Sequence, residues 1–235
     1  MSGSAITLSE PAITVAIGYS RRVARWEPDA QGRLEKAAME LFQERGYART
    51  TVGDIAERAG LTERTFFRYF VDKREVLFSS SRWLEESVVE AVRKAPVDAL
   101  PLDIVAEAFA SIARELQAQH DFSYVRARYA IVVEHAEVRE RELIKMATLT
   151  TAVMRALRAR GVTEPQASLA AEAGITVFKI GFERWVTAKK PSDFATHVRD
   201  ALTALRAVTA TTTPAPRKKA NVKARRDSSG RPSKF

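Results

Sequence analysis

The 235-residue sequence has no cysteine and only three histidines. Without cysteine the chain forms no disulfide, offers no thiolate to a metal ion and has no cysteine nucleophile. The histidines, His120, His135 and His197, are far apart in the sequence and show no spacing typical of metal ligands. We therefore expect neither a metal site nor a cofactor.

The sequence also lacks the signals of secretion, membrane insertion and common enzyme chemistry. Its N-terminal apolar stretch, AITVAIG at residues 12–18, is too short for a secretion signal or a membrane span. No nucleophile elbow, phosphate-binding loop or spaced pair of acid and base groups is present. We expect a cytoplasmic protein that is not an enzyme and has no membrane partner. A hydrolase built on His135 and a nearby carboxylate is the remote alternative.

Positive charge is concentrated at the C-terminal end of the chain. Of the net charge of +9, residues 214–235 contribute +7, from eight lysines and arginines and one aspartate. Residues 210–235 are expected to form a disordered basic tail, which attracts phosphates without reading sequence or serves only solubility. Residues 1–27 are expected to form a flexible basic arm that either reaches a DNA minor groove or stays solvated. Its basic residues are Arg21, Arg22 and Arg25.

Residues 28–75 have the pattern of three helices of unequal length. The first helix ends at Gly46 and carries apolar residues at helical spacing, namely Leu34, Ala37, Ala38, Leu41 and Phe42. Two short helices follow, in TTVGDIAERAGL and at residues 63–69, with Gly60 as the break between them. Helices this short are unstable alone and need longer neighbours as a platform. The arrangement is that of a helix-turn-helix domain.

The segment GLTERTFFRYF, residues 60–70, divides its side chains between two sides of a helix. Phe66 and Phe70 are four residues apart, so both should pack inward on the platform. Phe67 and Tyr69 should lie toward the rim, together with the polar residues of the segment.

Capping signals support these helix limits. Thr51 and Asp54 resemble a capping box, and Thr62 is a suitable cap for the second short helix. Asp72 and Glu75 form another capping pair, which predicts that a long helix begins there.

Residues 76–209 are helical in pattern throughout. A connecting helix at 76–95 comes first, and further helices are expected at about 102–119, 122–134, 137–160, 164–188 and 191–209. No strand-type alternation of useful length appears. We predict an all-α fold, with an N-terminal three-helix helix-turn-helix domain (28–75) and a larger C-terminal helical bundle domain (76–209).

Residues 33–78, RLEKAAMELFQERGYARTTVGDIAERAGLTERTFFRYFVDKREVLF, resemble the DNA-binding domain of TetR-type (TetR/AcrR) transcriptional regulators. The matching features are RGY, TTVGDIAERAGLT, TFFRYF and DK, in order and without gaps. Phe67 departs from the family, which commonly has tyrosine there, and Tyr69, at a position often held by histidine, offers a hydroxyl nearby. The resemblance implies a homodimer whose C-terminal domain dimerises and often holds a small-molecule pocket.

In a helix-turn-helix domain the second short helix enters the major groove of double-stranded DNA. Arg64 suits a guanine, Glu63 a cytosine amine and Thr65 a thymine methyl group. Thr51 and Lys73 are expected at helix N-termini, where phosphates bind. The predicted DNA-binding residues are Thr51, Thr62, Glu63, Arg64, Thr65, Phe67, Arg68, Tyr69 and Lys73. The alternative is that the charged residues are only solvated and Thr62 is only a cap.

The C-terminal helices carry aromatic residues and a few polar ones from which an effector pocket can be built. The possible pocket residues are Phe109, Phe122, Arg128, Tyr129, His135, Phe178 and Phe182. Most of these aromatics serve equally well as ordinary core. A lone histidine such as His135 more often has a structural role.

Residues 166–186 are apolar around so much of the helix that two sides must be covered. The helix that follows covers one side, and a two-fold partner would cover the other in a four-helix interface. The predicted interface residues are Leu169, Ala173, Val177, Phe178, Trp185, Val198 and Leu202. Burial within a single subunit is the alternative.

Together these patterns predict a homodimeric, sequence-specific DNA-binding transcriptional regulator. The favoured form is a repressor that binds a palindromic operator and is released by an unknown small, largely apolar effector. The alternative is a ligand-independent or activating DNA-binding regulator.

Overall fold

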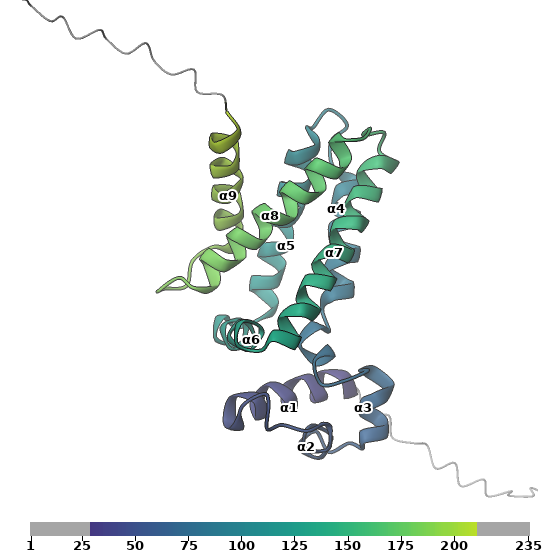
Figure 1. The fold of residues 1–235 in the computed structure, drawn as a ribbon, viewed down its shortest axis with the longest axis vertical. Helices are drawn as coiled ribbons and strands as arrows, with labels where there is room; N and C mark the ends of the chain where they lie inside the picture. The colour runs from purple at the N-terminus through teal and green to yellow at the C-terminus, as the bar shows by residue number, and fades with distance from the viewer. Residues whose placement is uncertain (1–28, 211–235) are drawn as a thin grey trace, which may run out of the picture.

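The computed structural model describes residues 29–210 (Figure 1). The predicted basic arm with Arg21, Arg22 and Arg25, and the basic tail from residue 211 onward, lie outside the described residues. Residues 29–210 form nine α-helices, one 3₁₀ turn and no strand, so the predicted all-α class is confirmed. The elements are α1 (Ala30–Arg45), α2 (Val52–Arg58), α3 (Glu63–Tyr69), the 3₁₀ turn η1 (Glu75–Phe78), α4 (Ser81–Lys94), α5 (Pro101–Gln119), α6 (Phe122–Glu134), α7 (Ala136–Ala159), α8 (Gln166–Val186) and α9 (Phe194–Thr209).

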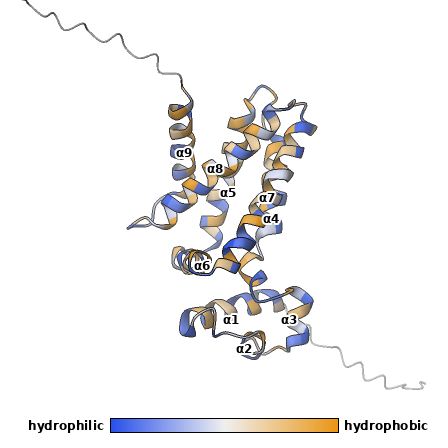
Figure 2. Cartoon of the chain, in the orientation of Figure 1, coloured by the Kyte–Doolittle hydropathy of each residue, from blue (hydrophilic) through white to orange (hydrophobic). Residues whose placement is uncertain are grey.

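Figure 1 shows a small head of α1, α2 and α3 at one end of a longer body. In the body, α5 and α8 pack against each other, α9 covers both of them, and α4 and α7 lie on the other side. Most helices of the head and body carry both hydrophilic and hydrophobic residues (Figure 2), as expected for amphipathic helices that bury one face. Within residues 29–210, no helix is both long and apolar enough to span a bilayer.

The caps predicted for the head helices are present. Thr51 and Asp54 form a reciprocal capping box at α2, in which the Thr51 backbone nitrogen donates to Asp54 Oδ2 at 2.8 Å. Thr62 Oγ1 accepts a hydrogen bond from the backbone nitrogen of Thr65 at 3.2 Å, which caps α3. Gly60 lies between the two helices with φ of 65°, a conformation that favours glycine. The sequence therefore sets both limits of the helix-turn-helix turn.

The head core is aromatic and extends past the boundary predicted at residue 75. Phe66 and Phe70 are buried, as predicted, with ring centroids 5.3 Å apart. The core continues through η1 into the ends of α6 and α7. The additional members are Val76, Leu77, Phe78, Ile131, Val132 and Val138. The head is therefore packed onto the body rather than tethered to it.

The long helix predicted from residue 76 is replaced by η1 and a separate helix α4 that begins at Ser81. Asp72 stabilises the turn that leads into η1, because its Oδ1 accepts hydrogen bonds from the backbone nitrogens of Arg74 and Glu75 at 2.8 and 3.3 Å. The three side chains that follow, Val76 to Phe78, are all buried in the head core. A continuous helix would turn one of them to solvent, so the chain bends before α4 starts.

The body core contains a chain of stacked aromatic rings. The ring centroids of Phe109 and Phe178 are 4.7 Å apart, and those of Trp185 and Phe194 are 4.6 Å apart. Phe182 lies between these pairs, 6.4 Å from Phe178 and 6.0 Å from Trp185. These aromatic contacts join α5, α8 and α9 within one subunit.

The interface residues predicted on α8 and α9 are therefore largely occupied within one chain. Val177, Phe178, Trp185 and Val198 are buried in the body core and do not face outward, which corrects their assignment to a partner surface. Ala173 and Leu202 are half-buried, and Leu169 is 65% exposed. The apolar circumference of α8 is explained mainly by contact with α5 and α9 of the same chain.

Two glycines of α8 allow this close contact. A methyl group at Gly174 would overlap the side chain of Val105 on α5. A methyl group at Gly181 would lie 2.9 Å from the Cα of Val198 and 3.1 Å from the carbonyl oxygen of His197, both on α9. The α9 backbone cannot move aside like a side chain.

We expect Gly181→Ala to destabilise the protein by about 1–3 kcal/mol, because overpacking against backbone forces α8 and α9 apart. Urea unfolding followed by circular dichroism measures the change. Thr148→Ala, at an exposed position of α7, is the control and should leave the midpoint nearly unchanged. A Gly181→Ala variant as stable as the wild type would contradict the close α8–α9 packing.

Candidate DNA-binding surface and effector pocket

The outer face of α3 is exposed and carries most of the predicted DNA-binding residues. The Phe66 side chain of α3 is fully buried and packs the helix onto the head core. Phe67, on the opposite side, is 54% exposed. Exposed residues on this face are Thr62, Glu63, Arg64, Phe67 and Arg68, and Thr65 and Tyr69 are half-buried. Thr51 is exposed at the N-terminus of α2. The structure therefore leaves Thr51 and these α3 residues at least partly accessible on the surface of the head.

Two of the predicted base-contacting residues are already held by neighbours. Arg68 Nη2 donates to the Tyr69 hydroxyl at 3.0 Å, and its guanidinium lies 4.9 Å from the centre of the Tyr69 ring. Tyr69 thus positions Arg68 as well as offering a hydroxyl of its own. The Glu63 carboxylate lies against the first turn of α2, where a methyl group at Gly53 would be 2.7 Å from Glu63 Oε1. Gly53 therefore makes room for Glu63 between the two helices.

Lys73 has a structural position that the sequence did not indicate. Its ammonium donates to the carbonyl oxygens of Tyr47 at 2.8 Å and Thr50 at 3.0 Å, and lies 4.2 Å from the centre of the Tyr47 ring. It follows α3 but does not begin a helix, since η1 starts at Glu75. The expectation of a helix N-terminus at Lys73 is wrong, and its charge instead fastens the segment after α3 to the loop after α1.

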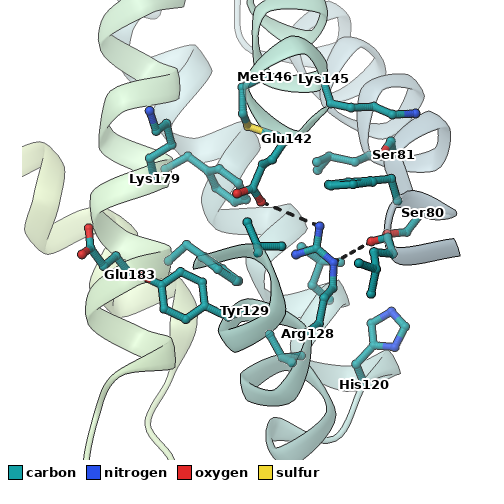
Figure 3. Close-up of a pocket in the computed structure, with 18 of the residues that line it drawn as sticks. Ser80, Ser81, His120, Arg128, Tyr129, Glu142, Lys145, Met146, Lys179 and Glu183 are labelled. Carbon is teal, nitrogen blue, oxygen red and sulfur yellow. Dashed lines mark hydrogen bonds and ion pairs between the residues drawn. The ribbon is translucent and has the colours of Figure 1, made fainter. Parts of the chain in front are cut away.

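A cavity of about 340 Å³ lies in the body, next to its junction with the head. Its walls come from η1, the start of α4, the end of α5, and α6, α7 and α8, with Phe194 of α9 at the edge. Figure 3 shows Arg128 of α6 pointing into the space between Glu142 of α7 and the η1–α4 segment. The apolar walls include Leu84, Leu116, Val125, Val132, Met146, Phe178, Phe182 and Trp185.

Four of the seven predicted pocket residues line this cavity, namely Arg128, Tyr129, Phe178 and Phe182. The other three belong to the packing around it. Phe109 is fully buried against Phe178, and Phe122 packs edge-on against Trp185 with ring centroids 5.2 Å apart. His135 ends α6, and its ring lies 4.7 Å from that of Tyr47 in the head. These three residues do not line the cavity.

The sequence interpretation missed several polar residues of the cavity. Glu142 and Lys145 come from α7, Lys179 and Glu183 from α8, and His120 from the end of α5. Each looks like a solvated surface residue in the sequence. The angles at which α5, α6, α7 and α8 meet bring these polar residues to one cavity. Helical periodicity within a single helix therefore could not predict that they line it.

Arg128 is the central polar group of the cavity. Its Nε donates to the Leu77 carbonyl oxygen of η1 at 2.6 Å, and its Nη2 lies 3.7 Å from Glu142 Oε1. The guanidinium also lies 5.1 Å from the centre of the Phe78 ring. Burial lowers the pKa of Arg128 from its usual value, and the nearby Glu142 carboxylate opposes that shift. The guanidinium remains charged at neutral pH, because an arginine pKa is far above 7.

Burial also affects His120, on the head side of the cavity. Burial lowers the pKa of His120 from its usual value of 6.5. The positive charge of Arg128 lowers this pKa further, and the carboxylate of Glu35 on α1 opposes the shift. Burial therefore favours the neutral imidazole. Its ring is stacked on Tyr124 with centroids 5.4 Å apart, and Tyr124 packs against the head core. A contact path thus runs from the cavity through α6 to α1.

Glu75 links the head to α7 directly. Its carboxylate accepts hydrogen bonds from Arg141 and, at 3.1 Å, from Lys145 Nζ. Burial by itself would raise the pKa of Glu75, but the hydrogen bonds from these two cations outweigh it, so the pKa is lowered from 4.5. The ion pairs hold η1 on α7, next to the Leu77 carbonyl that Arg128 binds.

Comparison with known proteins agrees with this geometry. Residues 34–79 match the family model of bacterial regulatory proteins, tetR family. The chain is 36% identical over 80 residues to the HTH-type transcriptional regulator TcmR of Streptomyces glaucescens, a match that covers 34% of this chain and 35% of TcmR. It is 30% identical over 95 residues to CymR of Pseudomonas putida, which covers 40% of this chain and 47% of CymR. The chain thus spans less than half the length of these curated relatives.

The whole fold also has solved counterparts. The structure is similar to FadR of Thermus thermophilus, a TetR family transcriptional repressor in complex with lauroyl-CoA, with a TM-score of 0.50 and 26% sequence identity. This match covers 79% of the present chain and 98% of FadR.

A short exposed helix on a buried aromatic base defines the head as a helix-turn-helix DNA-binding domain. The matches identify it more closely. The chain carries a TetR-type DNA-binding domain within a TetR-like fold, which confirms the resemblance seen in residues 33–78.

We expect Glu75→Gln to lower stability at neutral pH by about 1–2 kcal/mol, because Arg141 and Lys145 lose a partly buried ionised partner. A carboxylate with a lowered folded-state pKa stabilises the protein above its unfolded pKa and loses that effect as pH falls through the folded-state value. The difference between wild type and variant should therefore shrink below about pH 4.5.

Chemical denaturation between pH 3.5 and 7.5 measures this difference. Glu86→Gln, which removes an exposed partner of Arg82 on α4, is the control and should have little effect at any pH. A Glu75→Gln deficit that stays constant over the whole range would argue against the ion pairs as its source.

Proposed function

We propose that the protein is a homodimeric transcriptional repressor that binds a palindromic operator and leaves it when a small, largely apolar effector fills the cavity. In this proposal residues 28–75, with a core that extends to Phe78, read DNA, and residues 76–209 bind the effector and dimerise. The observation that carries the proposal is Arg128, because one side chain both lines the cavity and holds the Leu77 carbonyl of the head junction at 2.6 Å.

The operator-reading part rests on the exposed face of α3. Arg64 is exposed near the N-terminal end of α3, which in this class of domain lies nearest the base edges. Arg68 lies one helical turn after Arg64 on α3, and a hydrogen bond to Tyr69 orients its side chain. Thr51, at the capped start of α2, is exposed and suited to a phosphate. A planar guanidinium pairs with two acceptors of guanine, so Arg64 is the best candidate for base recognition.

The effector part rests on the cavity and on FadR. A volume of about 340 Å³ with mostly apolar walls and a few polar groups is typical of small-molecule sites. FadR, a repressor of similar fold, has been solved with lauroyl-CoA. A ligand in the cavity would shift the protein toward conformations in which η1 is displaced, provided that it binds those conformations more tightly.

Release then follows from the geometry of a dimer on DNA. Two recognition helices that read a palindrome must lie about 34–36 Å apart, one turn of DNA. Displacement of η1 would rotate α1 to α3 relative to the body, because Val76 to Phe78 are part of the head core. A change of spacing costs contacts at both half-sites at once.

The dimer surface in this proposal uses the side of α8 that the chain's own core leaves uncovered. Leu169 is 65% exposed and Ile180 40% exposed, and the half-buried Ala173 lies between them. Positions 169, 173 and 180 follow helical spacing and share one face. An isologous contact of two such faces would form a two-fold interface.

The DNA-reading step is tested by selecting bound sequences from random duplex DNA with wild type and with Arg64→Ala. We expect a palindromic consensus with the wild type. Arg64→Ala should lose about 1–3 kcal/mol of discrimination at one symmetric pair of positions, the worth of a bidentate base contact. Arg82→Ala on α4 is the control and should reproduce the wild-type consensus. Binding without any consensus would contradict sequence-specific reading.

The dimer is tested with Leu169→Glu combined with Ile180→Glu. We expect the pair to turn the dimer into a monomer in sedimentation experiments and to abolish tight operator binding, since charges in an apolar interface are costly when buried. Val97→Glu, at a position 97% exposed between α4 and α5, should leave the dimer intact. A dimer that survives the double substitution would place the interface elsewhere.

A further inference from the structure

We propose that the effector is an apolar carboxylic acid and that Arg128 binds its carboxylate through both terminal nitrogens of the guanidinium. This inference rests on the proposed function, because it assigns a ligand class to the same cavity. The observation behind it is that Arg128 uses its Nε donor in a hydrogen bond within the protein, while its terminal edge meets the Glu142 carboxylate only at ion-pair distance.

A guanidinium has five N–H donors in a fixed plane. In Arg128 the Nε donor is used, in the 2.6 Å hydrogen bond to the Leu77 carbonyl. Within residues 29–210 the two terminal nitrogens have no hydrogen bond, and the nearest carboxylate oxygen, Glu142 Oε1, is 3.7 Å from Nη2. That distance is an ion-pair contact, longer than a hydrogen bond. Arg128 therefore presents its terminal edge, the edge that binds carboxylates in a bidentate manner, to the cavity.

The position of Arg128 favours an interaction with an anion at this edge. Its side chain is only 21% exposed, and the surrounding walls are mostly apolar. Ion pairs and hydrogen bonds are stronger in such surroundings than in water, because little solvent screens them. A ligand carboxylate would supply two hydrogen-bond acceptors at once. A neutral amide supplies only one acceptor, its carbonyl oxygen, because its NH₂ group is a donor and would meet the donors of the guanidinium.

The charges around the cavity also favour an anion. Arg139, Lys145 and Lys179 lie on its walls beside Arg128, against Glu142 and Glu183. Lys145 is already paired with Glu75. The lining thus keeps an excess of positive charge after that pairing. Figure 3 shows Lys179 and Glu183 on α8, away from Arg128 on α6, whereas Lys145 on the η1 side is held by Glu75.

The remaining walls suit the apolar body of such an acid. Phe178, Phe182 and Trp185 form one side, and Met146 and Leu116 come from other helices. The volume of about 340 Å³ is at the lower end of the range for small-molecule sites, so a medium-length alkyl chain or a two-ring system matches it.

Binding at this edge would reach the head through the same side chain. A carboxylate on the terminal nitrogens competes with Glu142 and draws the guanidinium toward the ligand. The Nε–H bond to Leu77 must then bend or move η1 with it. The carboxylate is therefore the part of the ligand that we expect to change operator affinity, and the apolar body supplies most of the affinity for the cavity.

The test compares acids with their primary amides, using octanoate with octanamide and dodecanoate with dodecanamide. Calorimetric titration of the full-length protein at pH 7.5 measures affinity, and operator release by each compound is measured in parallel. We expect each acid to bind about 10- to 100-fold more tightly than its amide, the ratio that hydrogen bonds to a charged group provide. Lauroyl-CoA is the third probe, because it joins an acyl chain of dodecanoate length to phosphates and has no free carboxylate.

Four variants assign the effect to one residue. Arg128→Met should abolish the preference for acids while amide affinity persists, and Arg128→Lys should keep the charge but only part of the preference, because it lacks the planar fork. Glu142→Gln should tighten acid binding by removing a competing carboxylate. Lys179→Met is the matched control, which removes a positive charge from the cavity wall without touching Arg128, and it should keep most of the preference.

Several outcomes would overturn the inference. They are equal binding of acids and amides to the wild type, an unchanged preference in folded Arg128→Lys and Arg128→Met, and an equal loss of preference in Lys179→Met. Tight lauroyl-CoA binding without any preference for free acids would also overturn it, in favour of phosphate recognition. These results are separate from a failure of the proposed function, which would show as no specific operator binding by the ligand-free wild type.

Discussion

The attachment of η1 to the body is the constraint on which the rest of the structure depends. This single 3₁₀ turn puts Val76, Leu77 and Phe78 into the head core, while its polar groups are held by Arg128 of α6 and by Arg141 and Lys145 of α7. Packed interfaces of this kind have discrete arrangements rather than continuous ones. The position of the recognition helix is therefore set by contacts that also form the wall of the cavity.

This arrangement explains why polar groups are buried at the junction. A purely apolar junction would hold the head just as firmly, because buried ion pairs add little net stability over well-packed hydrophobic residues. Polar contacts differ in that a ligand with the right charge can compete for them. Arg128 and Glu142 are 3.7 Å apart, close enough to attract and too far for a strong hydrogen bond, so their pairing is open to competition. In the proposed function, this competition is the means by which a ligand in the cavity acts on the head.

The helix-turn-helix head was predictable in detail because its determinants are local. Thr51, Asp54 and Thr62 cap helices within three residues of themselves, Gly60 supplies a backbone angle, and Phe66 and Phe70 follow helical spacing. Lys73 was misplaced because its partners, the carbonyls of Tyr47 and Thr50, are more than twenty residues away. The interface residues on α8 were misassigned for a similar reason, since an apolar helix does not reveal which neighbour covers it.

The sequence by itself determined the all-α class, the limits of most helices and the division of α3 into a buried aromatic side and an exposed polar side. These features depend on periodicity and capping, which act over one or two helical turns. Only the tertiary structure decided that α8 is covered by α5 and α9 of its own chain, that a cavity forms beside η1, and that Arg128 meets both Glu142 and Leu77. Those features depend on the angles between helices, and such angles arise from the packing of side chains that are distant in the sequence.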